Sequence, residues 1–353
     1  MGLWFKGVRS SKWVYASHDF GGRNRHWDIV NLFIHIFTKL SQVDVTRVLI
    51  TGASGFIGSH LTKKLADDRN EVVVLYRDAV PSLWLEEALE NCVKVRGDIR
   101  NLELLKRVVN EYEIEHVYHL AGETIVGRAY RDPINTFETN LTGTLNMLEV
   151  CRQLDVKQVL VQSTDKVYGA REEAREEDRL VPLEPYNTSK ICQDYLARCY
   201  VETYGMKVAI PRCCNVYGYD RASRIVPNII RSCLREDPPV LYAGEEETTR
   251  QYIYVGDTCN ALTFIMKKNW IGPINVGTND VLTQAQVVRR ICQHFGIHER
   301  LVERQKTFKQ ISKQSMNWSR FRTLGWGPQF TFDEGIKLTI EAFKRYRGDW
   351  DRR

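Results

Sequence analysis

A tyrosine and a lysine, Tyr186 and Lys190, lie four residues apart and form the pair in this sequence best suited to moving a proton. On one helix their side chains would lie on the same face. An ammonium group near a phenol favours the phenolate, and lowering the pKa of a tyrosine from near 10 to about 7 takes roughly 4 kcal/mol of differential stabilisation. Such a phenolate could take the proton of a hydroxyl group while hydride leaves the same carbon. Because Tyr-x-x-x-Lys is a common coincidence, the pair gains meaning only from its context.

A second reactive segment, Ser163 to Gly169, precedes this pair and reads Ser-Thr-Asp-Lys-Val-Tyr-Gly. Thr164 offers a hydroxyl group. Asp165 and Lys166 offer two ionisable groups, which implies proton transfers beyond the one at the tyrosine. The alternative is that these two side chains form a structural ion pair.

Three glycines spaced three residues apart indicate a site for a dinucleotide. They lie between an apolar run that ends at Ile50 and the start of an amphipathic helix. The first permits a tight turn, the second lets the backbone approach a pyrophosphate, and the third lets helix and strand pack closely, while the helix N-terminus offers amide donors. The predicted cofactor-binding residues of this turn are Gly52, Gly55, Phe56, Ile57 and Gly58.

The end of the second predicted strand bears on which dinucleotide binds. An acidic side chain there normally holds the adenosine ribose, but the expected position, 18 residues past Gly58, is Tyr76. Asp78 could reach the 2′-hydroxyl and favour NAD, whereas Arg77 could meet a 2′-phosphate and favour NADP. The sequence leaves this choice open.

The elements that must position these residues alternate regularly. Apolar runs predict strands at residues 48–50, 71–75, 92–95, 116–120, 158–162 and 207–211, with charged amphipathic stretches between them. Strands alternating with helices of this length imply right-handed crossovers and a parallel sheet covered on both faces. We therefore predict an α/β fold with a doubly wound parallel sheet of the Rossmann type.

We predict three parts along the chain. Residues 46–212 form the dinucleotide-binding domain. Residues 213–353, where the alternation fades, form mainly a smaller C-terminal α/β lobe for the substrate, with some elements returning to the sheet. Residues 1–45 are an N-terminal extension of unknown role, with a possible short amphipathic helix at 28–40.

The bulk composition excludes several classes of protein. The excess of 50 basic over 44 acidic residues is too small in 353 residues to indicate binding of nucleic acid. Nine cysteines without a Cys-x-x-Cys pair indicate reduced thiols in a cytoplasmic protein, and no metal site is expected. No window approaches the roughly 18 to 20 apolar residues of a membrane span.

The motifs run in the order found in the extended short-chain dehydrogenase/reductase superfamily, and from about residue 47 to 345 the chain resembles the NAD-dependent epimerase/dehydratase family. The matching motifs are the glycine turn, Val117–Gly122, Asn140, Gly143-Thr144, Ser163–Gly169, Pro185–Lys190, Arg212, Asn215–Gly218, Arg250–Asp257 and Leu324–Trp326. The resemblance implies a soluble enzyme that acts on a nucleotide-diphosphate sugar with NAD or NADP.

The resemblance also assigns further site residues. Asp98 and Ile99 would contact the adenine, although Asp98 could instead cap a helix, and Leu120 and Ala121 would line the cofactor site. The predicted substrate ligands are Asn215 at the diphosphate, with Arg224 and Arg250 at the diphosphate or ribose. Arginine suits this role because its forked donors match phosphate oxygens, and for Arg224 the alternative is an ordinary surface arginine.

The Asp165-Lys166 pair separates members of this family. The 4-epimerases carry small or hydroxyl residues there, whereas 4,6-dehydratases need two more ionisable groups. The resemblance therefore implies a nucleotide-sugar 4,6-dehydratase, closest to the CDP-glucose enzymes, with an internally recycled cofactor. Asp165 would be the acid at C6 and Lys166 the base at C5. Thr164 would bind the C4 oxygen, while Tyr186 and Lys190 serve the hydride step.

Two alternatives stay open. One is a nucleotide-sugar 4-epimerase or decarboxylase, in which the Asp-Lys pair only binds substrate. The other is a non-catalytic relative that binds a regulator or RNA, which the intact set of Thr164, Tyr186 and Lys190 disfavours. Long helices expected at about 140–153 and 186–204 resemble an intersubunit four-helix bundle, so a homodimer or homotetramer is expected.

Overall fold

The computed structural model describes residues 3–6, 13–16, 46–78, 82–242, 246–302 and 312–351. The chain divides into two compact units, residues 1–45 and residues 46–353. In the first unit, strands β1 (Leu3–Lys6) and β2 (Trp13–Ala16) pair antiparallel. The helix predicted at residues 28–40 lies outside the described residues. The second unit contains every residue predicted for the site.

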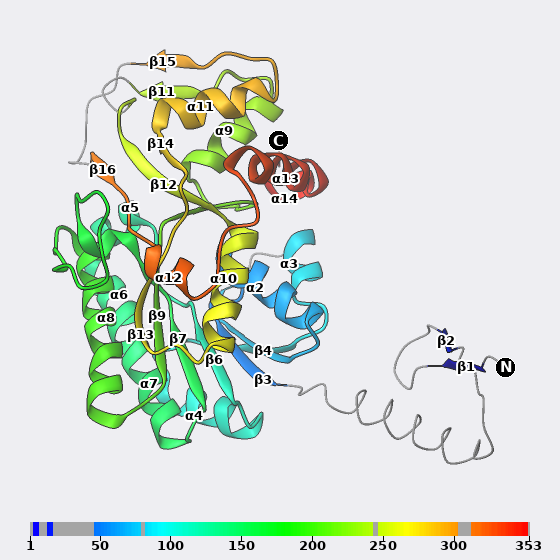
Figure 1. The fold of residues 1–353 in the computed structure, drawn as a ribbon, viewed down its shortest axis with the longest axis vertical. Helices are drawn as coiled ribbons and strands as arrows, with labels where there is room; N and C mark the ends of the chain where they lie inside the picture. Colours follow the sequence, from blue (N-terminus) through cyan, green and yellow to red (C-terminus); the bar gives the residue numbers. More distant parts are fainter. Residues whose placement is uncertain are drawn as a thin grey trace. The chain divides into compact units, whose positions relative to one another are not determined.

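An eight-stranded parallel sheet forms the centre of the second unit (Figure 1). Its order is β13-β9-β7-β6-β3-β4-β5, and the short β8 pairs with β9. The strands are β3 (Arg47–Thr51), β4 (Glu71–Tyr76), β5 (Val93–Arg96), β6 (His116–His119), β7 (Gln158–Val161), β8 (Ser163–Thr164), β9 (Val208–Cys213) and β13 (Gly272–Val276). The order reverses between β3 and β6, and ligands bind at the carboxyl ends of strands beside such a reversal. The predicted doubly wound α/β fold is confirmed, and each of the six predicted strands lies within one or two residues of its observed limits.

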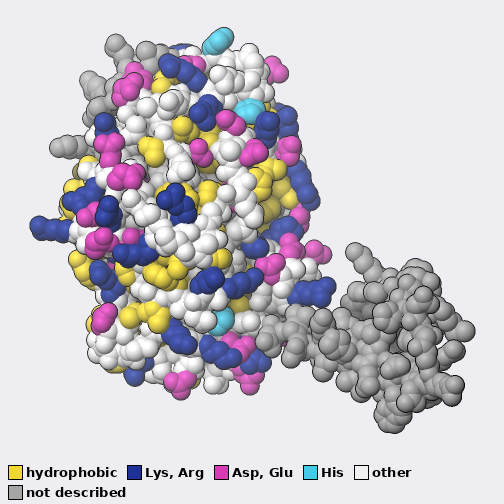
Figure 2. Space-filling model, viewed as in Figure 1, with side chains coloured by type: hydrophobic (Ala, Val, Ile, Leu, Met, Phe, Trp, Pro, Cys, Tyr) yellow, Lys and Arg dark blue, Asp and Glu magenta, His cyan; other side chains and the backbone are white. Residues whose placement is uncertain are grey.

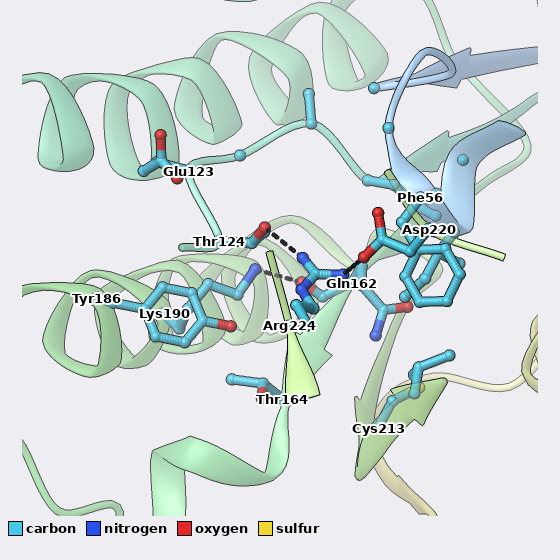
Figure 3. Close-up of a pocket in the computed structure, with 18 of the residues that line it drawn as sticks. Phe56, Glu123, Thr124, Gln162, Thr164, Tyr186, Lys190, Cys213, Asp220 and Arg224 are labelled. Atoms are coloured by element: carbon cyan, nitrogen blue, oxygen red, sulfur yellow. Dashed lines mark hydrogen bonds and ion pairs between the residues drawn. The ribbon is translucent and has the colours of Figure 1, made fainter. Parts of the chain in front are cut away.

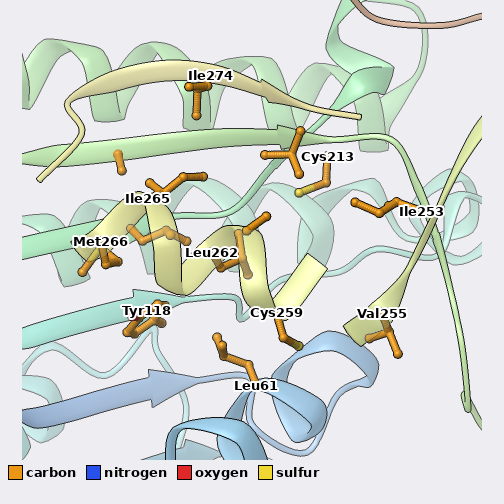
Figure 4. Packing of buried hydrophobic residues seen from close by; sticks show 14 of the residues in the cluster. Leu61, Tyr118, Cys213, Ile253, Val255, Cys259, Leu262, Ile265, Met266 and Ile274 are labelled. Carbon is orange, nitrogen blue, oxygen red and sulfur yellow. The ribbon is translucent and has the colours of Figure 1, made fainter. Parts of the chain in front are cut away.

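Alternate residues of the central strands face opposite helical layers. Val48 and Ile50 pack toward one layer, and Leu49 between them packs toward the other. The first layer contains α2 (Phe56–Asp67) and α10 (Val255–Lys267), and the second contains α4 (Leu102–Glu111), α7 (Gly143–Gln153) and α8 (Pro185–Tyr204). Figure 4 shows Leu262 and Ile265 of α10 between that helix and the strands. Each such buried side chain contributes roughly 1.5–3 kcal/mol to folding, so both faces of the sheet that carries the site are stabilised by packing.

The elements past residue 214 form a smaller lobe with its own core. A second sheet pairs β10 (Asn215–Tyr217), β12 (Thr249–Tyr254), β14 (Val281–Thr283) and β16 (Lys313–Gln314), while β11 (Val240–Tyr242) pairs with β15 (Arg300–Val302). Its helices are α9 (Ile225–Leu234), α11 (Gln284–Gln293), α13 (Phe332–Arg345) and α14 (Arg347–Trp350), whereas α12 (Ser319–Thr323) packs Phe321 into the core of the large sheet beside β13. Two elements after residue 212 belong to the large domain: β13 is a strand of the large sheet, and α10 packs on one face of that sheet. The chain therefore leaves the large sheet and later returns to it. The predicted limits of the two domains stay a prediction.

The end of the chain is fastened to α3 (Leu83–Ala88), a short helix that contacts α2. The Asp349 carboxylate accepts hydrogen bonds from the backbone N–H groups of Leu83 at 2.8 Å and Trp84 at 3.1 Å. The Trp84 indole in turn donates to Ser59 of α2 at 2.9 Å. The C-terminal helix therefore supports the helix that begins at the glycine turn.

Charges of both signs and free thiols characterise the described part of the chain. On the face shown in Figure 2, basic and acidic side chains are interspersed. All nine cysteines are free thiols. Within the described ranges, no helix is long and apolar enough to cross a membrane, and no three His, Cys, Asp or Glu side chains form a group that could hold a metal ion.

Candidate active site

A cavity of about 850 Å³ lies where the carboxyl ends of the large sheet meet the C-terminal lobe. Its wall contains the glycine turn, the ends of β4 and β6, the segment after β7, the start of α8, and residues from β10 to α9. Every residue predicted for the site lines this cavity except Arg250. The fold thus brings together residues that lie as far apart in sequence as the glycine turn after β3 and the start of α9.

The glycine turn leaves a cradle of backbone at one end of the cavity. Gly52 has a φ of 73°, and a Cβ atom there would lie 2.8 Å from the backbone of Ala121. A Cβ atom at Gly58 would lie 2.1 Å from the carbonyl oxygen of Gly52. Gly55 is the N-cap of α2 and offers no side-chain acceptor to the first amides of that helix. Open amides at a helix N-terminus, approached without side chains, fit the pyrophosphate of a dinucleotide.

The end of β4 presents an ion pair to the cavity. Arg77 Nε donates to Asp78 Oδ2 at 2.7 Å, and the Arg77 guanidinium also lies 3.7 Å from Asp98 Oδ2. Arg77 and Asp78 are half to two-thirds exposed. Arg77 and Asp78, the two side chains predicted to contact the ribose or its 2′-phosphate, therefore lie together at the cavity and form an ion pair.

Asp98 follows β5 and is held by Arg100. The Arg100 side chain donates to both Asp98 oxygens at 2.8–3.2 Å, and the Arg100 backbone N–H donates at 2.9 Å. Burial raises the pKa of Asp98, but the hydrogen bonds from Arg100 and the charges of Arg100 and Arg77 outweigh it and bring the pKa below its usual value. The alternative of a helix cap is wrong, because Asn101 caps α4.

Tyr186 lies in the first turn of the long helix α8, on the helix that the sequence predicts. Pro185 occupies the first turn, and the Glu184 carboxylate caps the helix by accepting from the backbone N–H of Tyr186 at 2.8 Å. The phenol is 8% exposed. Burial raises its pKa to about 12, and a hydrogen bond with Thr164 opposes that shift. The expected lowering of the phenol pKa is absent from this structure.

The Lys190 ammonium is held by acceptors other than the phenol. Lys190 Nζ donates to the carbonyl oxygen of Gln162 at 2.5 Å (Figure 3). It also donates to the side chain of Gln193. Burial lowers the pKa of Lys190 to about 8, and the nearby charge of Asp194 opposes this shift. The two residues lie on the same helix as predicted, but the charge of Lys190 does not outweigh the burial of the phenol.

Asp165 and Lys166 form the most densely bonded part of the site. Lys166 Nζ lies 2.9 and 3.1 Å from the two Asp165 oxygens, 3.1 Å from Asn215 Oδ1 and 2.7 Å from Gln314 Oε1. Burial lowers the pKa of Lys166, and the charge of Asp165 opposes this shift. The ion pair considered as an alternative for these two residues is therefore present. Gln314 was missed by sequence reasoning, because it belongs to no motif.

The two predicted arginines lie in different places. Arg224, at the N-terminus of α9, donates to Asp220 at 2.7 Å and to Thr124 at 3.2 Å, with its guanidinium over the ring of Phe56 (Figure 3). Arg250 lies outside the cavity wall, and its guanidinium donates to backbone carbonyl oxygens, including that of Thr249 at 2.7 Å. Other residues that the sequence did not single out also line the cavity: Glu123, Thr124, Gln162, Cys213, Cys214 and Asp220.

Comparisons with known proteins agree with this geometry. A dTDP-glucose 4,6-dehydratase from Xanthomonas campestris pv. campestris is 30% identical over 324 residues, which are 84% of this chain and 92% of that protein. The crystal structure of the Streptomyces venezuelae dTDP-glucose 4,6-dehydratase DesIV, with NAD and TYD bound, is 30% identical with a TM-score of 0.79 and covers 87% of this chain and 99% of that one. The crystal structure of the Thermus thermophilus UDP-glucose 4-epimerase in complex with NAD is 32% identical with a TM-score of 0.77. The match covers 85% of this chain and 99% of that one.

A family profile also matches most of the chain, and it belongs to the same group of enzymes as these relatives. The profile described as the NAD dependent epimerase/dehydratase family matches residues 48–277, which span the glycine turn, the Tyr186 and Lys190 pair and the start of the C-terminal lobe. This chain belongs to the NAD-dependent epimerase/dehydratase family.

Proposed function

We propose that the protein is an NAD-dependent nucleotide-sugar 4,6-dehydratase, which converts a nucleotide-diphosphate hexose into the 4-keto-6-deoxy sugar. One observation carries this proposal. A single cavity holds two sets of proton-handling side chains, one of Thr164, Tyr186 and Lys190 and one of Asp165 and Lys166. A 4-epimerase needs only the first set. The relatives named as dTDP-glucose 4,6-dehydratases support the same conclusion.

The first set suits the oxidation of C4. NAD, when bound, supplies an acceptor for the C4 hydride and, once reduced, a donor to C6. Tyr186 would take the proton of the C4 hydroxyl group as the phenolate, a form that the positive charge of a bound nicotinamide would favour against the burial that raises the phenol pKa to about 12, and Thr164 would hold the C4 oxygen by a hydrogen bond. The resulting ketone acidifies the proton at C5. The second set then handles the two proton transfers of the elimination, in which the C5 proton and the C6 hydroxyl group leave.

The ends of the cavity suit the two ligands. The glycine turn would hold the NAD pyrophosphate, Asp78 and Asp98 the adenosine, and Leu120 and Ala121 the neighbouring wall. Toward the C-terminal lobe, Asn215 and Arg224 would bind the substrate diphosphate. Arg250 would bind the nucleotide only if its side chain turns from its backbone partners. NAD is favoured over NADP because the solved relatives, the Thermus thermophilus epimerase and DesIV, carry NAD.

The test is a product analysis. Purified protein is incubated with CDP-, dTDP-, GDP- and UDP-glucose, and the products are weighed by mass spectrometry. We expect the loss of one water from at least one substrate, with no net consumption of NAD. The sequence resembles the CDP-glucose enzymes and the relatives named above are dTDP-glucose enzymes, so these two substrates are expected to react best. A changed sugar of unchanged mass would instead establish a 4-epimerase, and loss of carbon dioxide from UDP-glucuronic acid a decarboxylase.

Assembly and compartment are also proposed. Large apolar side chains are exposed on the helices α5 (Val126–Arg131), α6 (Pro133–Phe137), α7 and α8, among them Tyr130, Ile134, Leu145 and Tyr195. Tyr130 is 64% and Ile134 is 72% exposed in the single chain. Covering these helices with a second copy would form a homodimer. The nine free thiols support a reducing, cytoplasmic compartment.

A further inference from the structure

The Lys190 ammonium is held by two acceptors. Its Nζ donates to the carbonyl oxygen of Gln162 at 2.5 Å and to the side-chain oxygen of Gln193, which lies one turn further along α8. These two are the hydrogen bonds of Lys190 within the described part of the chain. An ammonium group has three N–H donors. One donor is therefore left on a side chain that lines the cavity.

The Gln193 amide is oriented by Thr144 of α7. Gln193 Nε2 donates to the Thr144 hydroxyl oxygen at 2.8 Å, and that hydroxyl donates its single proton to the carbonyl oxygen of Asn140 at 2.7 Å. Because Thr144 has no second proton to donate, it must meet the NH₂ group of Gln193, and the amide oxygen must face Lys190. Gln193 is 1% exposed, so water offers the amide no other partner.

His119 completes the surroundings of the Thr144 hydroxyl group. Its Nε2 lies 3.0 Å from Thr144 Oγ1, and its Nδ1 lies 2.8 Å from the hydroxyl group of Thr51, the residue before Gly52. Burial lowers the pKa of His119 to about 3, so the ring is neutral and has one donor and one acceptor. Since the Thr144 proton goes to a carbonyl group, Nε2 of His119 carries the ring proton. The hydrogen bonds thus connect Lys190 with the residue that precedes the glycine turn.

The carboxylate nearest to Lys190 along α8 is already paired. The charge of Asp194 opposes the effect of burial on the pKa of Lys190. Both Asp194 oxygens accept hydrogen bonds from Arg212, at 2.8 and 2.9 Å, and both side chains are fully buried. Gln193, and not Asp194, is therefore the side chain that accepts a hydrogen bond from the ammonium group.

The other titratable groups around Lys190 are uncharged at neutral pH. Burial raises the pKa of the Cys213 thiol on β9 to about 12, and it raises the pKa of the Tyr186 phenol to about 12. The imidazole of His119 on β6 is neutral for the reason given above. Any change in the Gln193 acceptor should therefore act directly on the proton affinity of Lys190.

We propose that Gln193 is a positioning residue: its amide oxygen holds the Lys190 ammonium at the cavity wall, protonated and with one N–H group left for the bound ligands. The proposal rests on the dehydratase function proposed above, in which Lys190 and Tyr186 serve the oxidation at C4. Gln193 does not line the cavity, so it acts on the ligands only through Lys190. Sequence reasoning did not single it out, because it belongs to no motif.

Two substitutions of Gln193 should change the proton affinity of Lys190 in opposite directions. Gln193→Met keeps the length of the side chain and removes the acceptor, so it should weaken proton binding by the amine about tenfold. Gln193→Glu keeps an acceptor and adds a negative charge beside the ammonium group, so it should strengthen proton binding by at least as much. A side chain that only fills space would not give effects of opposite sign.

Urea unfolding of the full chain at several pH values measures this change without any substrate. The unfolded chain gives Lys190 its ordinary pKa in every variant, so a lower pKa in the folded protein widens the range in which the free energy of unfolding rises with pH. From about pH 7 to about pH 10, we expect a larger rise in Gln193→Met than in the wild type, and a smaller rise in Gln193→Glu. Gln293→Met and Gln293→Glu, at an exposed position of α11, are the matched controls.

The pH dependence of catalysis gives a second readout. With whichever nucleotide sugar reacts in the product analysis, kcat/KM should fall on the alkaline side as Lys190 loses its proton. This fall should begin about one pH unit lower in Gln193→Met and at higher pH in Gln193→Glu. Thr144→Val, which removes the hydroxyl group that orients the amide, should shift the fall in the same direction as Gln193→Met. Thr144→Ser, which keeps the hydroxyl group, should restore the wild-type profile.

Three outcomes would overturn the proposal: both Gln193 variants change the pH dependence of unfolding in the same direction, neither changes it, or Gln193→Met lowers kcat/KM equally at every pH. Each would mean that Gln193 only packs against its neighbours. If Gln193→Met does not fold, Gln193→Glu decides alone, since it must make the rise in stability smaller. A wild type that converts none of the nucleotide sugars contradicts the proposed function instead, and the unfolding series still decides the role of Gln193.

Discussion

Replacing Lys190 with methionine should change how the stability of the protein depends on pH. Lys190 is 5% exposed, and burial lowers its pKa from 10.5 to about 8. Below about pH 8 the amine is protonated in both the folded and the unfolded chain, so burial of the ammonium group opposes folding by a constant amount. Between about pH 8 and 10.5 the unfolded chain binds more protons than the folded one, so the free energy of unfolding rises with pH.

The magnitude follows from the size of that shift. A difference from 10.5 to about 8 corresponds to about 3 kcal/mol at 1.36 kcal/mol per pKa unit. About 2 kcal/mol of this is recovered between pH 7 and about pH 9.5 by the linkage relation. The hydrogen bonds that Lys190 donates to Gln162 and Gln193 favour the ammonium form, so they oppose the lowering of its pKa and reduce the pH dependence that burial alone would give.

The assay is urea unfolding of the wild type and Lys190→Met at several pH values in this range. We expect the wild type to gain about 2 kcal/mol relative to the variant from pH 7 to about pH 9.5, because only the wild type carries the buried amine. Lys267→Met, on the exposed side of α10, controls for loss of a lysine elsewhere. A difference that stays constant with pH, or that falls as pH rises, would refute the reasoning.

Three further outcomes are expected. Tyr186→Phe should abolish turnover while NAD stays bound, because the change removes one ionisable oxygen and little volume; a variant that keeps most of its kcat in a steady-state assay would show that another group takes the C4 proton. Gly58→Ala should weaken NAD binding at least about 10²-fold by calorimetry, since the new methyl group would meet the Gly52 carbonyl at 2.1 Å, whereas Gly127→Ala, with open space around it, should bind normally. Sedimentation at micromolar concentration should give at least a dimer, and a monomer there would contradict the proposed interface.

The local features of the fold and site could be predicted from sequence because neighbouring residues determine them. The glycine turn needs residues without a Cβ at Gly52 and Gly58, and the apolar runs on either side give the strand and the helix. Tyr186 and Lys190 share a helix because their spacing is helical. Both features depend on residues that are close together in the sequence, so a short stretch of sequence is enough to recognise them.

Features set by tertiary contacts could not be predicted. Gln314 reaches Lys166 across 148 positions, and no pattern in the sequence connects them. Arg250 matches a family position, yet its guanidinium is taken by nearby carbonyl groups. The phenol of Tyr186 has a raised pKa, because burial outweighs charge and burial is a property of the packed molecule.

The return of the chain to its large sheet has a consequence for the protein as it leaves the ribosome. The strand Val208–Cys213 is buried along its whole length, and its outer neighbour, Gly272–Val276, is made about 60 residues later. At roughly 5–20 residues per second that gap lasts about 3–12 s. During this time the newest edge of the sheet presents an apolar strand with unpaired backbone groups, a template for pairing with another chain. We therefore expect that growing chains gain from shielding by a chaperone at this stage, and that co-expression of a chaperone raises the soluble yield when the protein is overexpressed.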